Sequence, residues 1–227
     1  MKDIKLSPRL AAVAEMAADS EVVADVGTDH GYLPIWLAQT DEERIIYATD
    51  VKMGPLLSAM NSAGEYGVSN RISFCFCDGL DFDEARECDT IVMAGMGGET
   101  IQYILSNAPW TRRGQLLVLQ PQSKLDELCC WLAENGYRLI GAVLVEDAGR
   151  LYVSMSAIGV GEPSDPRYAE DLLLEGRDTL LPVWVDERLK KLYTALEGME
   201  KSKSVCDTSA LKSAIARLET ILEREEA

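Results

Sequence analysis

The sequence predicts an α/β protein with a mostly parallel sheet covered by helices on both faces, an antiparallel strand hairpin at its end, and a small α-helical domain. In the first part of the chain, short and nearly all-apolar runs alternate with amphipathic segments, as expected for a buried parallel sheet. Only Glu146 to Gly149 separate the last two such runs, which favours an antiparallel pair. Beyond the Gly- and Pro-rich stretch 159–166, leucines recur at helical spacing.

The elements of the sheet can be placed in order along the chain. Ser7 and Pro8 open a first helix, as its cap and its first residue. Strands are expected at Val22 to Val26, Ile45 to Thr49, Ile72 to Cys77, Thr90 to Ala94, Leu116 to Leu119, Leu139 to Val145 and Leu151 to Ala157. Between them, helices are expected at Leu33 to Ala38, Leu56 to Tyr66, Glu99 to Ser106 and Leu125 to Glu134.

The C-terminal part predicts two amphipathic helices that fold back on each other as an antiparallel coiled coil. Asp207 or Thr208 is available to cap the second helix. We therefore expect two domains, residues 1–160 and 161–227. The apolar positions are Leu189, Leu192, Leu196 and Met199 in the first helix and Leu211, Ile215, Leu218 and Leu222 in the second.

Charge and cysteine content exclude several classes of protein. The 227 residues carry a net charge of −16, which argues against a protein that coats nucleic acid indiscriminately. Basic residues nevertheless prevail between 186 and 217, either as a solvated helical face or as a local patch for RNA. These basic residues are Arg188, Lys190, Lys191, Lys201, Lys203, Lys212 and Arg217.

The cysteines predict neither a metal site nor a disulfide framework. None of the six forms a C-x-x-C pair, and the single histidine, His30, is far from them in sequence. Cys75 and Cys77 alternate in a strand-like run, which favours small buried apolar side chains in a reducing compartment. No run approaches the roughly 20 apolar residues that span a bilayer, so we expect no membrane contact and a cytoplasmic location.

The loop after the first strand, Ala24 to Pro34, predicts a ligand site. Gly27 and Gly31 allow the backbone to turn sharply at the carboxyl edge of the sheet, where open α/β folds bind ligands. Asp50 ends the second strand, where a carboxylate commonly accepts hydrogen bonds from both hydroxyls of a ribose. Together these features predict a cofactor that contains a nucleoside.

The charge of this loop favours S-adenosylmethionine over a dinucleotide. Asp25 and Asp29 would repel a pyrophosphate, but they suit a ligand that carries an ammonium and a sulfonium. Asp78 is placed to accept from the adenine amino group, although Asp78-Gly79 can also be a plain turn and Asp25 a loop cap. His30 fits an orienting hydrogen-bond partner better than a catalytic base. The expected cofactor-binding residues are Asp25, Gly27, Asp29, His30, Gly31, Asp50, Val51, Asp78, Gly79, Ala94, Gly95 and Met96.

The loop after the fourth strand, within Val92 to Thr100, helps to predict which kind of substrate atom receives the methyl group. Amino-directed methyltransferases often carry Asn or Asp followed by two prolines here, because an exocyclic amine has protons to be held; this loop has neither. A ring nitrogen with a free lone pair needs no such acceptor, so backbone groups suffice to position the ring. The alternative is that these glycines only permit close packing at a helix start.

Five segments in order resemble a known family. They are Leu6 to Leu10, ADVGTDHGYLP from Ala24 to Pro34, AGMGG from Ala94 to Gly98, Leu119 to Pro121, and Glu146-Asp147-x-Gly-Arg-x-Tyr152. They resemble the bacterial tRNA adenine-22 N1-methyltransferases called TrmK, over essentially the whole chain. The resemblance implies a class I, Rossmann-like, S-adenosylmethionine-dependent domain, a coiled-coil C-terminal domain and a tRNA substrate. Gln122 and Val153 depart from the family pattern, which often has Asn and Glu there.

These observations favour methyl transfer to N1 of an adenine in tRNA by a monomer. Asp29 is the candidate catalytic residue, to stabilise the cationic product or take a proton, or it binds the donor instead. One alternative is a methyltransferase for a small metabolite, dimerised by the helical hairpin, and another is a catalytically silent, cofactor-binding interaction protein. The candidate substrate-binding residues are Arg9, Arg112 and Arg113 for phosphates, Tyr32 for stacking, with Trp110 as an alternative, and Gly97 and Gly98 for the approaching base.

Overall fold

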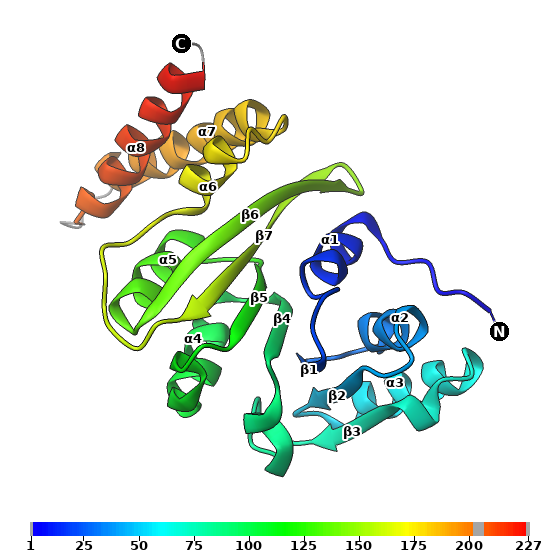
Figure 1. Ribbon diagram of the computed structural model, residues 1–227. Coiled ribbons are helices and arrows are strands. Elements are labelled where there is room, and N and C mark those ends of the chain that lie inside the picture. The colour runs from blue at the N-terminus through cyan, green and yellow to red at the C-terminus, as the bar shows by residue number, and fades with distance from the viewer. Residues whose placement is uncertain (1, 202–206, 226–227) are drawn as a thin grey trace.

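The computed structural model describes residues 2–201 and 207–225, and in them seven strands form a single sheet (Figure 1). The sheet order is β3-β2-β1-β4-β5-β7-β6. Strands β1 to β5 are parallel, and β7 runs antiparallel to both β5 and β6, which confirms the predicted mixed sheet. The strands are β1 (Val22–Val26), β2 (Ile45–Asp50), β3 (Ile72–Phe76), β4 (Thr90–Met96), β5 (Leu116–Pro121), β6 (Tyr137–Asp147) and β7 (Arg150–Gly159).

Helices cover both faces of this sheet. Ser7 caps α1 as predicted, because its hydroxyl accepts from the Leu10 amide at 3.4 Å and Pro8 takes the first helical position. The helices that cover the sheet are α1 (Pro8–Met16), α2 (Tyr32–Thr40), α3 (Met53–Glu65), α4 (Gly98–Asn107) and α5 (Leu125–Glu134). Short 3-10 turns η1 (Ser69–Arg71), η2 (Asp83–Glu87) and η3 (Pro109–Arg112) join some of these elements.

Two hydrophobic clusters lie on opposite sides of the sheet. Alternate residues of each strand face opposite ways, so Val23 packs with α1 to α3 while Ala24 packs with α4 and α5. Each central strand is therefore apolar on both faces, which explains why the sequence shows continuous apolar runs rather than alternation.

The strand order creates a crevice at the carboxyl edge of the sheet. β1 pairs with β2 on one side and with β4 on the other. Strands β2 and β3 therefore extend the sheet to one side of β1, and β4 and β5 extend it to the other side. The loops that follow β1 and β4 therefore leave toward opposite faces. Ligands of open α/β sheets bind at such a switch point.

The last two strands form a long hairpin that ends the sheet. Asp147 pairs directly with Arg150, so the turn has two residues, Ala148 and Gly149, rather than the four expected. Both turn residues have positive φ, 50° and 74°, as the tight hairpin turn requires.

Three helices pack on this hairpin: α6 (Ala169–Glu175), α7 (Leu181–Lys201) and α8 (Ser209–Glu225) (Figure 1). Leu144 of β6 and Val153 of β7 join their apolar cluster. The pair α7–α8 is antiparallel, since Lys212 near the start of α8 pairs with Glu200 near the end of α7 at 3.2 Å.

Two details of this helical region bear on the sequence-based expectations. The short helix α6 was not expected, because its seven residues are too few to show a clear period. Asp207 accepts from the Ser209 amide at 2.9 Å at the start of α8. The division into domains 1–160 and 161–227 stays a prediction, and Lys203 and Cys206 lie outside the described residues.

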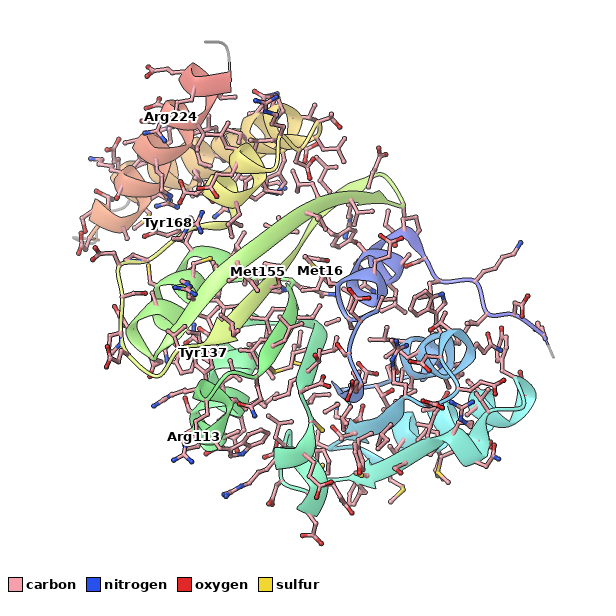
Figure 2. All side chains as sticks on the ribbon, in the orientation of Figure 1. Met16, Arg113, Tyr137, Met155, Tyr168 and Arg224 are labelled. Carbon is pink, nitrogen blue, oxygen red and sulfur yellow. The ribbon has the colours of Figure 1, made fainter. Side chains whose placement is uncertain are left out.

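Charged side chains tie the helices to the sheet. Asp126 of α5 pairs with Arg188 of α7 and, at 2.8 Å, with Arg217 of α8. Arg217 also pairs with the buried Glu170 and stacks 3.4 Å from the ring centroid of Tyr168, which lies between the helices and the sheet (Figure 2). The guanidinium groups of Arg188 and Arg217 are therefore paired with carboxylates of the fold, and the role of the basic stretch 186–217 in RNA binding stays a prediction.

The cysteines in the described residues are free thiols. Cys88 and Cys129 are buried, and burial raises the pKa of each thiol to about 12. Cys75 and Cys77 are only half-buried, which corrects the expectation of burial, because β3 is an edge strand and Cys77 lies just after its end. No disulfide framework therefore holds this part of the chain together.

Candidate active site

A cavity of about 880 Å³ opens at the carboxyl ends of β1, β2 and β4, at the switch point of the sheet. Residues from distant parts of the sequence meet there, including most of the predicted cofactor-binding set. The predicted residues that line it are Arg9, Asp25, Gly27, Asp29, His30, Tyr32, Asp50, Val51, Ala94, Gly95 and Met96.

Backbone hydrogen bonds shape the loop after β1. The amides of Gly27 and Thr28 both donate to the Thr49 carbonyl at 2.9 Å, and the Gly31 amide donates to the Thr28 carbonyl at 2.9 Å. Gly31 has a φ of 72°, and a Cβ there would lie 2.8 Å from the Cβ of Ala59 in α3. Glycine is therefore required at this position for both its conformation and its close approach to α3.

Two carboxyl groups at the ends of neighbouring strands face this cavity. Burial, together with the nearby charge of Asp50, raises the pKa of Asp25 to about 7. The Asp50 carboxylate is held by the Lys52 amide, which donates to it at 2.8 Å. The buried Thr28 hydroxyl lies close enough to Asp25 to offset part of this rise in the pKa, although it makes no hydrogen bond of good geometry within the described chain.

A more exposed group of side chains forms the mouth of the cavity. Asp29 has a positive φ of 52°, and its carboxylate lies 3.7 Å from Nε2 of His30. Nδ1 of His30 is 2.9 Å from the Ser58 hydroxyl, and the ring stacks on Tyr32 with centroids 5.6 Å apart. A non-glycine residue in the left-handed region is a strained feature typical of ligand sites.

Gln120 organises the opposite wall of the cavity. This buried side chain accepts from Nη1 of Arg9 at 2.7 Å and from the Gly95 amide at 3.2 Å. The guanidinium of Arg9 also lies 5.6 Å from the ring centroid of Tyr152 in β7. Arg9 is thus held beside the cavity rather than on an open surface.

The remaining predicted residues lie outside this cavity. Asp78 accepts from the Tyr103 hydroxyl at 3.0 Å and lines a separate pocket of about 320 Å³, while Gly79 packs on Ile104. Gly97 and Gly98 stand at the start of α4, where a Cβ on Gly98 would lie 2.8 Å from the Lys124 carbonyl oxygen. For Gly98 this favours the alternative of close packing at a helix start.

Arg112 and Arg113 lie just before β5, at the amino-terminal edge of the sheet and therefore opposite the cavity. Arg112 donates to the Asn135 side chain at 3.3 Å, and Trp110 packs on the apolar core. The structure thus does not bring Arg112, Arg113 or Trp110 to the cavity at the switch point.

Comparison with known proteins places this geometry in a family. A family described as "Methyltransferase domain" matches residues 6–155, which contain every residue that lines the cavity except Lys5. The chain belongs to this methyltransferase family. The tRNA (adenine(22)-N(1))-methyltransferase of Bacillus subtilis (strain 168) is 36% identical over 153 residues, which cover 67% of this chain and 64% of that enzyme. The matched region thus spans somewhat less than two thirds of this relative's length.

Two solved methyltransferase structures share the fold over nearly the whole chain. The crystal structure of the B. subtilis M1A22 tRNA methyltransferase TrmK is 29% identical with a TM-score of 0.72, covering 97% of both chains. A Streptococcus pneumoniae protein solved in complex with S-adenosyl-L-methionine is 27% identical with a TM-score of 0.78, covering 96% of this chain and all of that one. These relatives confirm the resemblance to the TrmK family.

Sequence analysis of this methyltransferase missed several residues that line the cavity, among them Lys5, Ser7 and Gln122, and it missed Gln120, which holds Arg9 and Gly95 in place behind the lining. The signal for Gln120 was present, because a polar residue at the end of an otherwise apolar strand must find a buried partner. The sequence contains no comparable signal for Lys5, Ser7 and Gln122. They lie at the cavity because the N-terminal segment and the loop after β5 pass beside it.

Two further searches bear on the kind of site. Within residues 2–201 and 207–225, no group of three or more His, Cys, Asp or Glu side chains is arranged to hold a metal ion. In the same residues, no helix combines the length and hydropathy that crossing a bilayer demands.

Proposed function

We propose that this protein is an S-adenosylmethionine-dependent methyltransferase that modifies N1 of adenine-22 in tRNA. The observation that carries the proposal is the cavity at the switch point, where the carboxyl groups of Asp25 and Asp50 face a glycine turn. Relatives with the same fold are named for this reaction. The proposal includes a monomeric enzyme that works in the cytoplasm, where its substrate is found.

The residues of the cavity fit the cofactor group by group. Asp25, beside the unsatisfied Thr28 hydroxyl, suits the cofactor ammonium, and Asp50 suits the ribose hydroxyls. Gly27 has a φ of 75°, a conformation that favours glycine at this turn. When bound, S-adenosylmethionine supplies a methyl group on a sulfonium, whose sulfur keeps the bonding electrons when the methyl group leaves.

The chain contributes orientation and charge rather than a nucleophile. N1 of adenine carries a lone pair and no proton, so it forms the new bond directly once the ring is aligned. Tyr32 and the His30 ring on which it stacks offer a flat surface for a base at the mouth of the cavity. Asp29 lies beside them and is positioned to stabilise the positive charge that the ring acquires.

The two alternative functions, methylation of a small metabolite and cofactor binding without catalysis, predict different experimental results. A methyltransferase for a small metabolite would have a turnover that changes little with salt, whereas tRNA binding weakens steeply as salt is added. A catalytically silent binding protein would retain the cofactor and transfer nothing.

The decisive experiment uses the full chain, methyl-labelled S-adenosylmethionine and two transcripts of one tRNA. One transcript has adenine at position 22 and the other has guanine there. We expect label to enter only the adenine transcript and nucleoside digestion to yield 1-methyladenosine. Equal labelling of both transcripts, or none of either, would contradict the proposal.

A further inference from the structure

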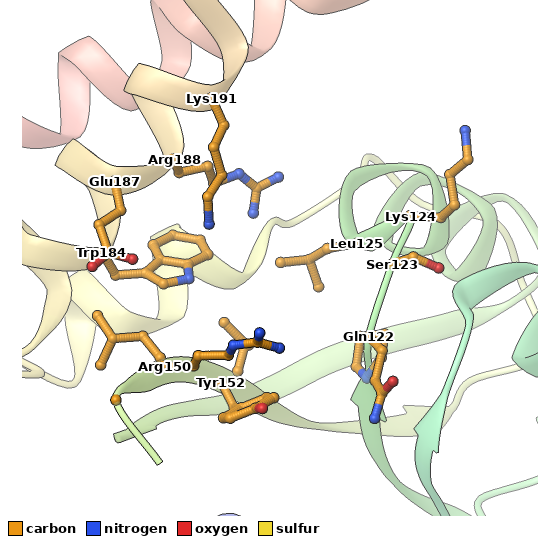
Figure 3. A pocket seen from close by; sticks show the side chains of 14 residues that line it. Gln122, Ser123, Lys124, Leu125, Arg150, Tyr152, Trp184, Glu187, Arg188 and Lys191 are labelled. Carbon is orange, nitrogen blue, oxygen red and sulfur yellow. The ribbon is translucent and has the colours of Figure 1, made fainter. Parts of the chain in front are cut away.

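A second large cavity, of about 840 Å³, lies between the strand hairpin and α7 (Figure 3). One wall comes from β7 and its turn, a second from α7, and a third from the loop between β5 and α5. A volume of this size holds a ligand as large as a nucleotide. None of the functional assignments above uses it.

The charge of this cavity is opposite to that of the chain. Lys124, Arg150, Arg188 and Lys191 line it, with Glu187 as the single acid in the lining. In a protein with a net charge of −16, such a gathering of cations creates a local positive potential.

Two of these cations have no charged partner among the residues that the structure describes. Arg188 pairs with Asp126 and Lys124 pairs with Glu127, but within the described residues Arg150 and Lys191 form no ion pair. Figure 3 shows the side chains of Arg150 and Lys191 extending from opposite walls toward the space between them. Both side chains are exposed, so each charge is available to an anion.

The second cavity adjoins the candidate active site. Gln122 lines both cavities, and Tyr152 of the second cavity lies against Arg9 of the first. Lys124, which lines the second cavity, has a φ of 59° and is thus another non-glycine residue in the left-handed region at a cavity. A long ligand can therefore run from one cavity into the other without leaving the surface.

We propose that the second cavity binds the phosphodiester backbone of the RNA next to the methylated nucleotide, with Arg150 and Lys191 contacting phosphates. This inference rests on the proposed function and adds a subsite to it. Cations from two separate elements, β7 and α7, suit a polyanion that passes between them, since each contacts a different phosphate. The ring of Tyr152 lines the second cavity next to Arg9 of the first, where the RNA strand enters the active site.

The test measures tRNA binding against salt for Arg150→Gln, Lys191→Gln and the double variant. Each lost phosphate contact lowers the slope of log affinity against log salt by about one, so we expect a loss of about two in the double variant. Its KM for tRNA should rise severalfold, while kcat at saturating tRNA stays near the wild-type value. Lys190→Gln is the matched control, because Lys190 neighbours Lys191 but pairs with Asp186 outside the cavity.

The outcomes separate this inference from the proposed function. A double variant with the wild-type slope, affinity and KM overturns the RNA subsite while leaving adenine methylation intact. Wild-type protein that binds no tRNA overturns both. Calorimetry should give all variants the wild-type affinity for S-adenosylmethionine, because neither Arg150 nor Lys191 lines the first cavity.

Discussion

The amide oxygen of Gln120 lies 2.7 Å from Nη1 of Arg9, although 111 residues separate them in sequence. The same oxygen accepts from the Gly95 amide at 3.2 Å. One buried side chain thus connects the N-terminal helix to the turn that ends β4, and both of these elements line the candidate active site.

Replacing Gln120 with leucine should therefore affect both stability and cofactor binding. The change leaves the Gly95 amide and the Arg9 guanidinium without their acceptor, a loss of about 1–3 kcal/mol in the free energy of unfolding. Urea denaturation measures this loss. A double-mutant cycle with Arg9→Met should show a coupling of at least about 0.5 kcal/mol, and additive effects would contradict the connection.

The raised pKa of Asp25 predicts a pH dependence of stability. The folded protein holds a proton on Asp25 up to about pH 7, whereas the ordinary pKa of an aspartate side chain is 3.8. The folded state therefore binds more protons in this window, and the contribution of Asp25 to stability falls as pH rises from about 4 to about 7. Asp25→Asn should remove this contribution and leave the unliganded protein more stable than wild type at pH 8, by at most about 4 kcal/mol.

The same residue predicts a pH dependence of cofactor binding. An ammonium ligand needs the ionised carboxylate, so affinity for S-adenosylmethionine should fall as pH drops below about 7. Calorimetric titration in buffers of different ionisation enthalpy should detect proton release on binding at pH 6. A pH-independent affinity in the wild type would remove Asp25 from the ammonium site.

The sequence predicted the fold more completely than the site, for physical reasons. Strands such as β1 were located at their true ends, because a buried strand is a short apolar run with clear limits. Asp25 and Asp50 were found because strand ends converge at one edge of a parallel sheet. The sequence could not place Arg112 relative to the cavity, because a cation in a loop carries no signal of which edge of the sheet it occupies.

Asp29→Asn tests the catalytic assignment without adding backbone strain. Asn, like Asp, tolerates the positive φ of 52° found here, so the substitution removes charge and little else. We expect turnover with saturating tRNA to fall on the order of 10²-fold while stability is unchanged. If the cofactor Kd rises and turnover at saturation does not fall, Asp29 binds the donor instead.

Gly98→Ala should disturb the start of α4 far more than its small size suggests. The new Cβ would lie 2.8 Å and 2.9 Å from the carbonyl oxygens of Lys124 and Ser123, both backbone atoms that cannot easily move. Gly54→Ala is the matched control, because a Cβ there, in α3, has nothing within 4 Å. We expect a lower thermal midpoint for the first variant, and an unchanged or higher one for the control.

Asp126 receives two guanidinium groups from separate helices, and its loss should loosen the helical region from the sheet. In Asp126→Asn the partly buried Arg188 and Arg217 lose a shared counter-charge, and Glu170 remains as a partner of Arg217. The cost should be about 2–4 kcal/mol. Asp186→Asn breaks an exposed pair with Lys190 and should leave the stability nearly unchanged. Hydrogen exchange should then accelerate in α7 and α8 while β1 to β5 keep their protection, because Asp126 contacts these helices directly. Equal acceleration in the sheet, or none in the helices, would mean that the apolar contacts of Leu144 and Val153 hold the helices in place without the ion pairs.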